Sequence, residues 1–421
     1  MLYFSKGAPQ FAFSHEELRR SVFETLDKLG PKKKVLVIPP DFTRFFSRAG
    51  EITQYVYEYY GDALTDILPA LGTHFPMEEG EIVRMFPGVP VSLFRVHDWR
   101  NDVVTVGTVP AEYVKEISGG AANYSWPAQV NKLLIEGGFD LILSVGQVVP
   151  HEVLGMANYN KNIFVGTGGA EGINKSHFIG AAYGMERVMG RAINPVRLVL
   201  NYASDNFTQH LPIVYIQTVV SKGEDGLQLR GLYIGDDVEC FTRAADLSLK
   251  VNFVMMDREM KKVVVYLDPE EFRSTWLGNK SIYRTRMAIA DDGDLIVLAP
   301  GIKQFGEDTT IDRLIRKYGY RNTPEVMKLV AENEDLQNSL GVAAHLIHGT
   351  SEGRFRITYA PGHLTREEIE SVWYNYADLN GMMQKYDITK LKDGWNMVDG
   401  EEIFYISNPA LGLWAYRERF V

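Results

Sequence analysis

The sequence has one cysteine, Cys240, among its 421 residues. A single thiol cannot form a disulfide within the chain or a cluster of thiolate metal ligands. If the chain binds a soft metal, the ligands must come from histidine, from carboxylate groups or from sulfur that a cofactor carries.

Long apolar runs and clustered basic residues are also missing. No stretch approaches the roughly 18 consecutive apolar residues that span a membrane, and residues 1–14 lack the charged and apolar regions of a secretion signal. The formal net charge is -10, and the basic run at residues 32–34 precedes a predicted strand. Because phosphate contacts need clustered Lys and Arg, nucleic-acid binding is not expected. We expect a cytoplasmic protein with no membrane or nucleic-acid partner.

The chain does contain a repeated order of short apolar run, loop and helical pattern. Such runs are typical of buried strands, and we predict strands at residues 35–38, 66–71, 91–96, 141–145, 197–202, 262–267 and 294–298. Strands that alternate with helices indicate parallel sheets with helices on both faces. The predicted fold class is therefore α/β.

The length of the chain indicates two domains. We assign residues 1–250 to an N-terminal catalytic and cofactor-binding domain and residues 251–404 to a C-terminal α/β domain. Each should hold a mostly parallel sheet flanked by helices, with the active site in the cleft between the domains. Residues 405–421 are expected to pack back on the first domain, and residues 275–290 have a helical pattern.

The loop from residue 148 to residue 177 carries the densest group of reactive side chains. It follows the predicted strand at 141–145 and contains His151, Lys161, His177 and several glycines. Sites in α/β folds lie at such strand ends, and glycine lets the backbone approach a ligand closely. Imidazole and amine groups there can bind a metal, move protons or form a covalent adduct. A lone histidine on a loop is, however, more often solvated or hydrogen-bonded than catalytic.

Two other predicted strands end in polar motifs. The strand at 35–38 runs into Asp41-Phe-Thr43-Arg44, and the strand at 66–71 runs into a Gly-Thr-His-Phe-Pro segment that contains His74. Asp41 and Arg44 could bind a ligand, pair with each other or cap the next helix. Since the carboxyl ends of parallel strands share one edge of a sheet, these motifs and the 148–177 loop can meet in one pocket.

The predicted strand at 91–96 ends at His97 and Asp98. These two side chains could form a surface pair or could support the site from behind. The surface pair is the interpretation that the local pattern favours.

The order and spacing of these motifs resemble the lactate racemase family, whose members use a nickel-pincer nucleotide. The family pattern is an Asp-x-Thr-Arg tetrad, a Gly-Thr-His-x-Pro segment, and a Pro-His loop. In that loop a lysine follows the histidine by ten residues, and a second histidine follows the lysine by sixteen. This chain has Asp41, Thr43, Arg44, His74, His151, Lys161 and His177 at the matching places.

The resemblance implies an isomerase, a racemase or epimerase that inverts C2 of a 2-hydroxy acid. Lys161 would hold the nickel-pincer nucleotide covalently through a thioamide, and His177 would be the protein ligand of nickel. His74 and His151 would be the paired acid and base. The expected partners are a small 2-hydroxy acid substrate and the proteins that synthesise the cofactor.

The same resemblance implies roles in binding. Asp41 and Thr43 would belong to the cofactor-binding tetrad, and Arg44 would hold the substrate carboxylate. In the second domain the family has a substrate-facing lysine about twelve residues before a Gly-Gly turn, and Lys280 fits that place.

Hydride transfer to such a cofactor explains the residue types. The Cα proton of a carboxylate is very weakly acidic, whereas removing a hydride needs only an acceptor and a base for the hydroxyl group. Two bases are needed because the hydroxyl lies on opposite sides in the two epimers. Histidine, with an ordinary pKa near 6.5, serves as both acid and base near neutrality.

The chain departs from the family pattern around these groups. Residues 156–160 read Met-Ala-Asn-Tyr-Asn where the family has Phe-Ser-Gly-Gly-Arg, Phe75 replaces an arginine, and Leu277 replaces a glutamine. The reacting groups are retained, so the same chemistry on a different substrate is expected. The polar groups at 158–160 and the C-terminal aromatics could bind extra hydroxyls. The expected substrate is therefore a sugar acid, an aldonate such as gluconate, with lactate or another short-chain 2-hydroxy acid as the alternative.

Two other classes of function stay open at this point. A zinc or other divalent-metal hydrolase could use His74, His151 and His177 as an open three-ligand site. That reading explains neither Lys161 nor Arg44. A non-catalytic binding protein could keep the fold without the chemistry, against which the retention of all the reacting groups counts.

Overall fold

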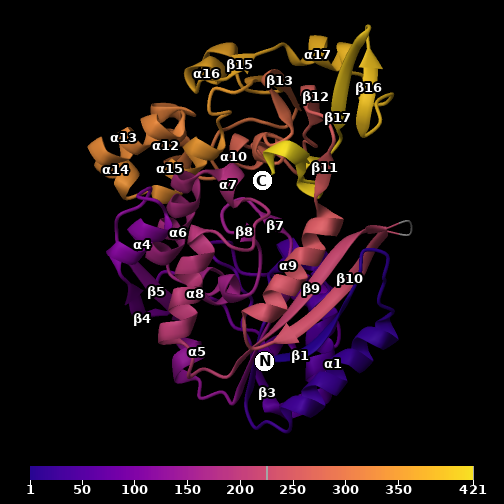
Figure 1. Cartoon of the computed structure of the whole chain (residues 1–421), viewed down its shortest axis with the longest axis vertical. Coiled ribbons are helices and arrows are strands. Elements are labelled where there is room, and N and C mark those ends of the chain that lie inside the picture. The colour runs from indigo at the N-terminus through magenta and orange to yellow at the C-terminus, as the bar shows by residue number, and fades with distance from the viewer. Residues whose placement is uncertain (224–225, 421) are drawn as a thin grey trace. The chain divides into compact units, whose positions relative to one another are not determined.

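The structure is a computed structural model that describes residues 1–223 and 226–420. It divides into two compact units (Figure 1). Unit 1 contains residues 1–179 and 187–252, and unit 2 contains residues 180–186 and the chain from Phe253 onwards. The chain therefore enters unit 2 briefly at residues 180–186 before it completes unit 1.

Unit 1 is built on a six-stranded sheet in the order β1-β10-β9-β6-β2-β3. Its strands are β1 (Leu2–Gly7), β10 (Gly226–Gly235), β9 (Ile213–Gly223), β6 (Leu141–Gln147), β2 (Val35–Ile38) and β3 (Leu64–Ile67). The four strands β9, β6, β2 and β3 run parallel, while β1 and β10 add antiparallel strands at one edge.

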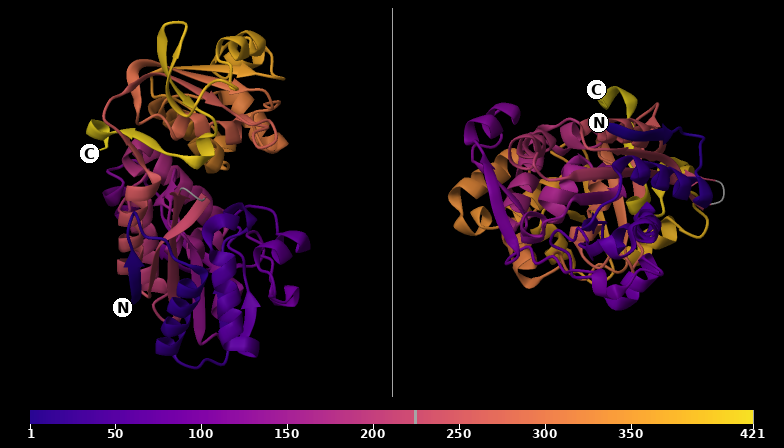
Figure 2. Two further views of the ribbon diagram at one scale, coloured as in Figure 1. Left: turned by 90° about the vertical axis from the view of Figure 1, so that its right-hand side faces the viewer. Right: turned by 90° about the horizontal axis from the view of Figure 1, so that it is seen from below.

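Helices bury both faces of this sheet (Figure 2). One face packs against α1 (His15–Leu29) and α2 (Ala49–Tyr60), and the other against α8 (Pro195–Phe207) and α9 (Val238–Asn252). The strand residues alternate between the two cores, so that Leu143 faces the first pair and Ile142 the second. This alternation is the period-2 pattern of a sheet that is buried on both sides.

Unit 1 also contains shorter helices, turns and strands. They are η1 (Phe42–Ser47), η2 (Gly61–Ala63), α3 (Glu79–Met85), η3 (Val91–Leu93), β4 (Val103–Val109), α4 (Ala111–Ile117), β5 (Trp126–Asn131), α5 (Lys132–Glu136), β7 (Pro150–His151), β8 (Gly155–Met156) and η4 (Asn162–Gly166). The short helix α7 (Met185–Val188) begins in unit 2 and ends in unit 1. The helix α6 (Ala170–Tyr183) begins in unit 1, and its last residues are counted with unit 2.

Two predicted strands of unit 1 are wrong. Residues 197–202 lie inside α8, because Asn194 accepts a hydrogen bond from the backbone of Arg197 and Pro195 occupies the first helical turn. Both are helix-start signals that outweigh a short apolar run. Residues 91–96 form the single turn η3 and one bridge from Phe94 to Ile67.

Unit 2 holds a second six-stranded sheet, in the order β15-β14-β13-β12-β17-β16. Its strands are β15 (Asn375–Tyr376), β14 (Arg356–Pro361), β13 (Ile289–Ala299), β12 (Met260–Tyr266), β17 (Glu401–Ile406) and β16 (Gly394–Val398). All neighbouring pairs are parallel except β16 with β17. Both sheets are thus mostly parallel and flanked by helices, which confirms the predicted α/β class.

The helices of unit 2 include two single turns where one long helix was expected. They are α10 (Thr275–Gly278), α11 (Lys280–Tyr283), α12 (Thr309–Tyr318), α13 (Thr323–Glu332), α14 (Glu334–Gln337), α15 (Leu340–His348), α16 (Arg366–Ser371) and α17 (Leu379–Lys385). The expected helix at 275–290 is interrupted at Asn279, whose buried side-chain oxygen accepts hydrogen bonds from Tyr359 and Tyr374 at 2.8 and 3.2 Å. These contacts, distant in sequence, could not be read from local pattern.

The C-terminal segment belongs to unit 2 rather than to the first domain, where it was expected. The strand β18 (Trp414–Tyr416) pairs in parallel with β11 (Val254–Met256), and Ala415 bridges to Met287. The turns η5 (Pro409–Leu411) and η6 (Arg417–Arg419) flank β18.

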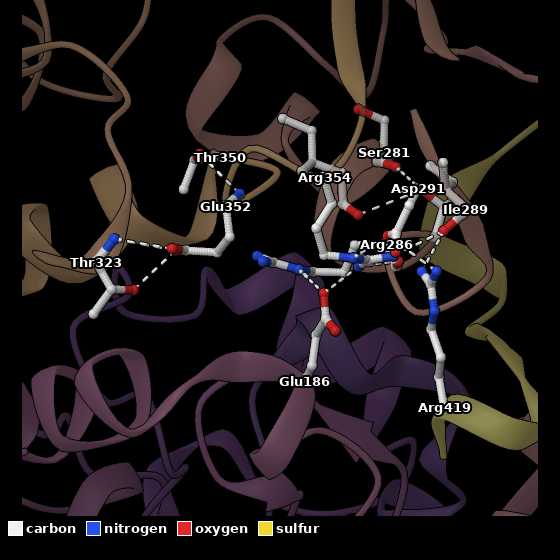
Figure 3. Close-up of polar contacts among 12 residues, drawn as sticks. Glu186, Ser281, Arg286, Ile289, Asp291, Thr323, Thr350, Glu352, Arg354 and Arg419 are labelled. Carbon is white, nitrogen blue, oxygen red and sulfur yellow. Dashed lines mark hydrogen bonds and ion pairs between the residues drawn. The ribbon is translucent and has the colours of Figure 1, made fainter. Parts of the chain in front are cut away.

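A group of ion pairs holds residues 180–186 in unit 2 (Figure 3). The Glu186 carboxylate accepts hydrogen bonds from Arg286 Nε at 3.0 Å and from Arg354 Nη1 at 2.6 Å. Arg354 also donates to the backbone oxygens of Arg286 and Ile289 and pairs with Asp291. The side chain of Arg286 is 3% exposed, so Glu186 is the carboxylate that compensates its buried positive charge.

Among the helices in the part of the chain that the structure describes, none is long and apolar enough to cross a membrane.

Candidate active site

Three strand ends of unit 1 carry the predicted site residues to one edge of the sheet. β2 leads to Asp41, β3 leads to His74 and β6 leads to His151. The loops are also tied to one another, because the backbone N–H of Gly72 donates to the oxygen of Gly166 at 2.8 Å. The side chains of this group also lie close enough to shift the pKa values of one another.

Asp41 and His74 form a pair. Asp41 Oδ2 lies 2.5 Å from His74 Nδ1, and the Asp41 side chain is 7% exposed while that of His74 is 59% exposed. Burial alone would raise the pKa of Asp41, but hydrogen bonds from His74 and Thr43 and the charge of Lys161 hold that pKa below its ordinary value. A carboxylate at Nδ1 leaves His74 Nε2 as the nitrogen that can accept a proton from a ligand.

His151 has a different hydrogen-bonding state. Its Nδ1 accepts a hydrogen bond from the backbone N–H of Val153 at 3.2 Å, so the neutral ring carries its hydrogen on Nε2. Burial lowers the pKa of His151 well below 6.5, the charges of Lys161 and Arg44 lower it further, and Glu152 opposes them. His151 is therefore neutral at pH 7.

Lys161 is an amine in a site of mixed charge. Burial lowers its pKa from 10.5 to about 8, with a further contribution from Arg44 that Asp41 and Glu152 oppose. A lysine with such a pKa is partly unprotonated near neutral pH, and only the unprotonated amine is nucleophilic.

His177 lies in α6, and a hydrogen bond at Nδ1 fixes the orientation of its ring. Nδ1 donates to the backbone oxygen of Ile173 at 2.7 Å. That bond places the hydrogen on Nδ1 and leaves the lone pair on Nε2, which is the arrangement of a metal-ligating histidine. Burial also lowers the pKa of His177, which favours the neutral ring.

The glycine turn before α6 is explained by packing rather than by approach to a ligand. A Cβ on Gly168 would lie 1.9 Å from the oxygen of Phe164, and one on Gly169 would lie 2.5 Å from Oε1 of Gln129. Gln129 also accepts from the N–H of Gly172 at 3.1 Å, in the first turn of α6. Through Gln129, the strand β5 thus supports the start of α6, the helix that carries His177.

His97 takes part in the same support and is not a surface pair with Asp98. It is 2% exposed, donates from Nε2 to the oxygen of Gly168 at 3.0 Å and accepts at Nδ1 from Asn131 at 2.9 Å. Asp98 instead accepts backbone N–H groups of its own turn. Because burial lowers the pKa of His97, the ring stays neutral and keeps both contacts.

Arg197 is a supporting residue that the sequence analysis missed, because the residue was assigned to a strand. The side chain is 1% exposed and donates to the backbone oxygens of Met156 and Asn158 at 2.7 and 3.2 Å and to the side chain of Asn160. Asn158 and Tyr159 both have positive φ, 67° and 58°. Arg197 therefore holds the strained segment at residues 158–160, directly before Lys161, through hydrogen bonds.

The polar residues at 158–160 do not face a substrate. Asn158 and Asn160 are 3% and 0% exposed, and Tyr159 is 6% exposed. Asn158 donates to Gln217 at 3.0 Å, and Asn160 donates to Asn201 and Ser204 at 2.8 and 3.1 Å. The argument that these groups bind substrate hydroxyls is therefore wrong.

Arg44 and Lys280 occupy different units. Arg44 lies in η1 with φ -114° and ψ 32°, and its charge lowers the pKa values of both His151 and Lys161. Lys280 is the first residue of α11 in unit 2, with Nζ 5.7 Å from the centre of the Phe272 ring. Substrate binding by these two residues stays a prediction.

The three histidines do not form a metal cluster by themselves. Within residues 1–223 and 226–420, no three His, Cys, Asp or Glu side chains are grouped as ligands of one metal ion. This geometry gives no support to the hydrolase with His74, His151 and His177 as its ligands.

Unit 1 is thus an α/β unit with a lysine, two arginines, three histidines and an aspartate around one end of a parallel sheet, the place where such folds bind ligands. Residues 23–188 match the family model of the lactate racemase N-terminal domain. This part of the chain is therefore similar to the lactate racemase N-terminal domain, and the similarity supports a racemase or epimerase, that is, an isomerase.

Two solved structures resemble the whole chain. A crystal structure of a protein from Thermotoga maritima has a TM-score of 0.79 and 25% identity, covering 98% of this chain and all of that one. The lactate racemase apoprotein from Thermoanaerobacterium thermosaccharolyticum has a TM-score of 0.71 and 16% identity, covering 98% and 94%. The second similarity concerns the fold. No curated protein matches the sequence.

Proposed function

We propose that the chain inverts C2 of a 2-hydroxy acid with a nickel-pincer nucleotide held by Lys161 and His177. The observation that carries this proposal is the grouping of a buried amine of lowered pKa with two histidines in complementary states. A hydrolase does not need that amine, whereas a covalently held cofactor does.

The donor set fits such a cofactor. Lys161 offers a partly unprotonated amine for a covalent bond, and His177 offers Nε2 as a neutral ligand. The protein supplies no thiolate here, since its one cysteine, Cys240, is buried elsewhere with a pKa raised to about 12 by burial. When bound, the nucleotide would supply the nickel-activated carbon that accepts a hydride and returns it.

The chain's own residues handle the protons. His74 takes the substrate hydroxyl proton at Nε2, and Asp41 stabilises the imidazolium that forms. His151 acts on the opposite epimer, for which its hydrogen must move from Nε2 to Nδ1 and the contact with Val153 must open. Arg44 holds the substrate carboxylate, and its charge adds to the burial that lowers the pKa of His151.

The substrate class in this proposal is a 2-hydroxy acid without a required sugar chain. The aldonate preference depended on residues 158–160, which are buried and engaged inside unit 1. The exposed side chain next to His74 is Phe75, at 93% exposure, which offers apolar contact rather than hydrogen bonds. We therefore propose lactate and larger apolar 2-hydroxy acids ahead of aldonates.

Deuterium at C2 tests the reaction. The holoenzyme, expressed with the cofactor-synthesis proteins, should invert (2-deuterio)lactate or (2-deuterio)phenyllactate in ordinary water with the label retained at C2. A hydride returned to the same carbon carries the deuterium with it, whereas proton abstraction exchanges it with solvent. Loss of the label from the inverted product would rule out hydride transfer as the mechanism. Inversion of gluconate alone would show that the substrate is an aldonate.

The pKa of Lys161 gives a second prediction that needs no cofactor. Competitive acylation of the apoprotein, read by peptide mass spectrometry, should show Lys161 reacting with a midpoint near pH 8. At that pH an ordinary lysine is unprotonated to only roughly 0.3%. Since the positive charge of Arg44 disfavours the ammonium form, Arg44→Met should move the midpoint upward. A wild-type midpoint above pH 10 would show that the amine is not activated.

A further inference from the structure

The segment from His151 to Lys161 is held by one face of a single helix. The side chains that contact it are the N-cap of α8 and three residues within that helix, namely Asn194, Arg197, Asn201 and Ser204. Their spacing of three, four and three residues places them in one stripe along the helix. This polar stripe contacts the part of the chain that connects two of the proposed reacting groups.

Asn194, at the N-cap, holds the hairpin of His151. Its Nδ2 donates to the backbone oxygen of Leu154 at 3.0 Å, while its Oδ1 caps the helix by accepting a backbone N–H. The pairing of β7 with β8 places Gly155 opposite His151. A Cβ on Gly155 would lie 2.1 Å from the backbone oxygen of Arg191, so the loop before α8 packs directly against this hairpin.

Arg197, one turn further on, holds the residues that follow the hairpin. Its guanidinium donates to the backbone oxygens of Met156 and Asn158 at 2.7 and 3.2 Å and to the side-chain oxygen of Asn160. A guanidinium carries five N–H donors in a fixed planar fork, so one side chain can bind three acceptors at once. Arg197 therefore fixes the path of the chain across three alternate residues.

Asn160 is the residue next to Lys161, and α8 binds its side chain at three points. It accepts from Arg197 and donates to Asn201 and Ser204 at 2.8 and 3.1 Å. Because the Asn160 side chain is fully buried, it cannot rotate without leaving polar groups unpaired. The direction in which the chain enters Lys161 is therefore set by α8.

Stability alone does not explain a charged residue at position 197. The side chain is 1% exposed, and the three acceptors of its guanidinium are uncharged. Burial lowers the pKa of Arg197 to about 10, so the group still carries its charge at pH 7. Apolar side chains of similar volume are often at least as stabilising as buried charges. The geometry of the fork is what an apolar residue could not supply.

We propose that Arg197 is a positioning residue, which fixes the Lys161 amine relative to His151 through the segment between them. Arg197 contacts neither substrate nor cofactor in this role. Four charges act on the amine that it positions, those of Arg44, Asp41, Glu152 and Arg197 itself. The proposal rests on the function proposed for Lys161, but its consequence can be measured in the apoprotein.

Competitive acylation of Lys161 in the apoprotein, read by peptide mass spectrometry, tests the positioning role. In Arg197→Met the midpoint of Lys161 acylation should rise by at least about one pH unit, because the amine leaves its buried site and loses a repelling charge. Arg197→Lys keeps a charge but has no fixed fork, so its midpoint should still rise by at least about half a unit. A positioning role thus predicts a higher midpoint in both variants.

Arg230→Met is the matched control. Arg230, in β10, is also buried, and it donates to two uncharged acceptors, Ser221 Oγ at 3.0 Å and the backbone oxygen of Phe11 at 3.2 Å. Neither acceptor belongs to the segment before Lys161. This variant should lose stability yet keep the wild-type midpoint to within about 0.3 unit, because its contacts are separate from those of Lys161.

Equal midpoints in the wild type and Arg197→Met, whatever their value, would overturn the proposal. An equal rise in Arg230→Met would do the same, because the shift would then report lower stability. A wild-type midpoint in Arg197→Lys would show that charge and not geometry controls Lys161, and this variant decides alone if Arg197→Met does not fold. These measurements need no nickel, nucleotide or substrate, so a failure of the proposed cofactor would be seen separately, as a wild-type chain that stays unmodified during cofactor loading.

Discussion

Replacing Lys161 with alanine is expected to abolish covalent attachment of the nucleotide completely. The amine is the group that would form the bond, and its pKa of about 8 makes it nucleophilic near neutral pH. Intact-protein mass spectrometry on chains expressed beside the cofactor-synthesis proteins should show an adduct on the wild type and none on Lys161→Ala. Because burial opposes the charge of this lysine, its removal should leave the fold intact.

His74→Ala and His151→Ala are the matched controls. Both variants should keep the adduct and its nickel, since Lys161 and His177 are unchanged. Both should lose inversion by about 100-fold or more, which is the usual loss when a general acid or base is removed. A wild-type chain that stays unmodified under these conditions, with zinc or with no metal, would refute the proposed cofactor. Full activity in either histidine variant would remove that residue from the acid-base pair.

The sequence was sufficient to predict the fold class and to gather most of the candidate site. Asp41, His74 and His151 each follow an apolar run that forms a central parallel strand. Strand ends of this kind meet at one sheet edge by geometry, so the proximity of the three motifs followed from pattern alone. Their chemical roles came from resemblance and stay predictions.

What the sequence could not reveal are contacts between residues far apart in the chain. Asn158, Tyr159 and Asn160 looked like exposed polar groups, but Arg197, Gln217 and Asn201 engage them in the interior. His97 looked like a surface residue for the same reason, and its partners are Gly168 and Asn131. The local sequence pattern predicts which positions of a helix or strand are buried. It does not predict which distant residues they contact.

The departures from the family pattern gain a physical explanation from these contacts. Two family glycines correspond to Asn158 and Tyr159, and both positions have positive φ, the conformation that glycine adopts without strain. This chain has side chains at both positions. The ring of Tyr159 packs between Tyr215 of β9 and Phe241 of α9.

Glu186→Ala should destabilise unit 2 by about 3–5 kcal/mol, because it leaves the buried guanidinium of Arg286 without its carboxylate. The backbone amides of β13, which begins three residues after Arg286, should then exchange with deuterium about two to three and a half orders of magnitude faster, if they exchange by opening of the unit. Asp294→Ala is the control: it breaks an ion pair of similar geometry, at 2.7 and 2.9 Å, with Arg356, whose side chain is 60% exposed. Exposed pairs contribute less than about 1 kcal/mol, so exchange should change less than about fivefold. Equal and small effects of the two substitutions would show that Arg286 does not depend on Glu186, and that the ion pairs of Figure 3 do not fix residues 180–186 in unit 2.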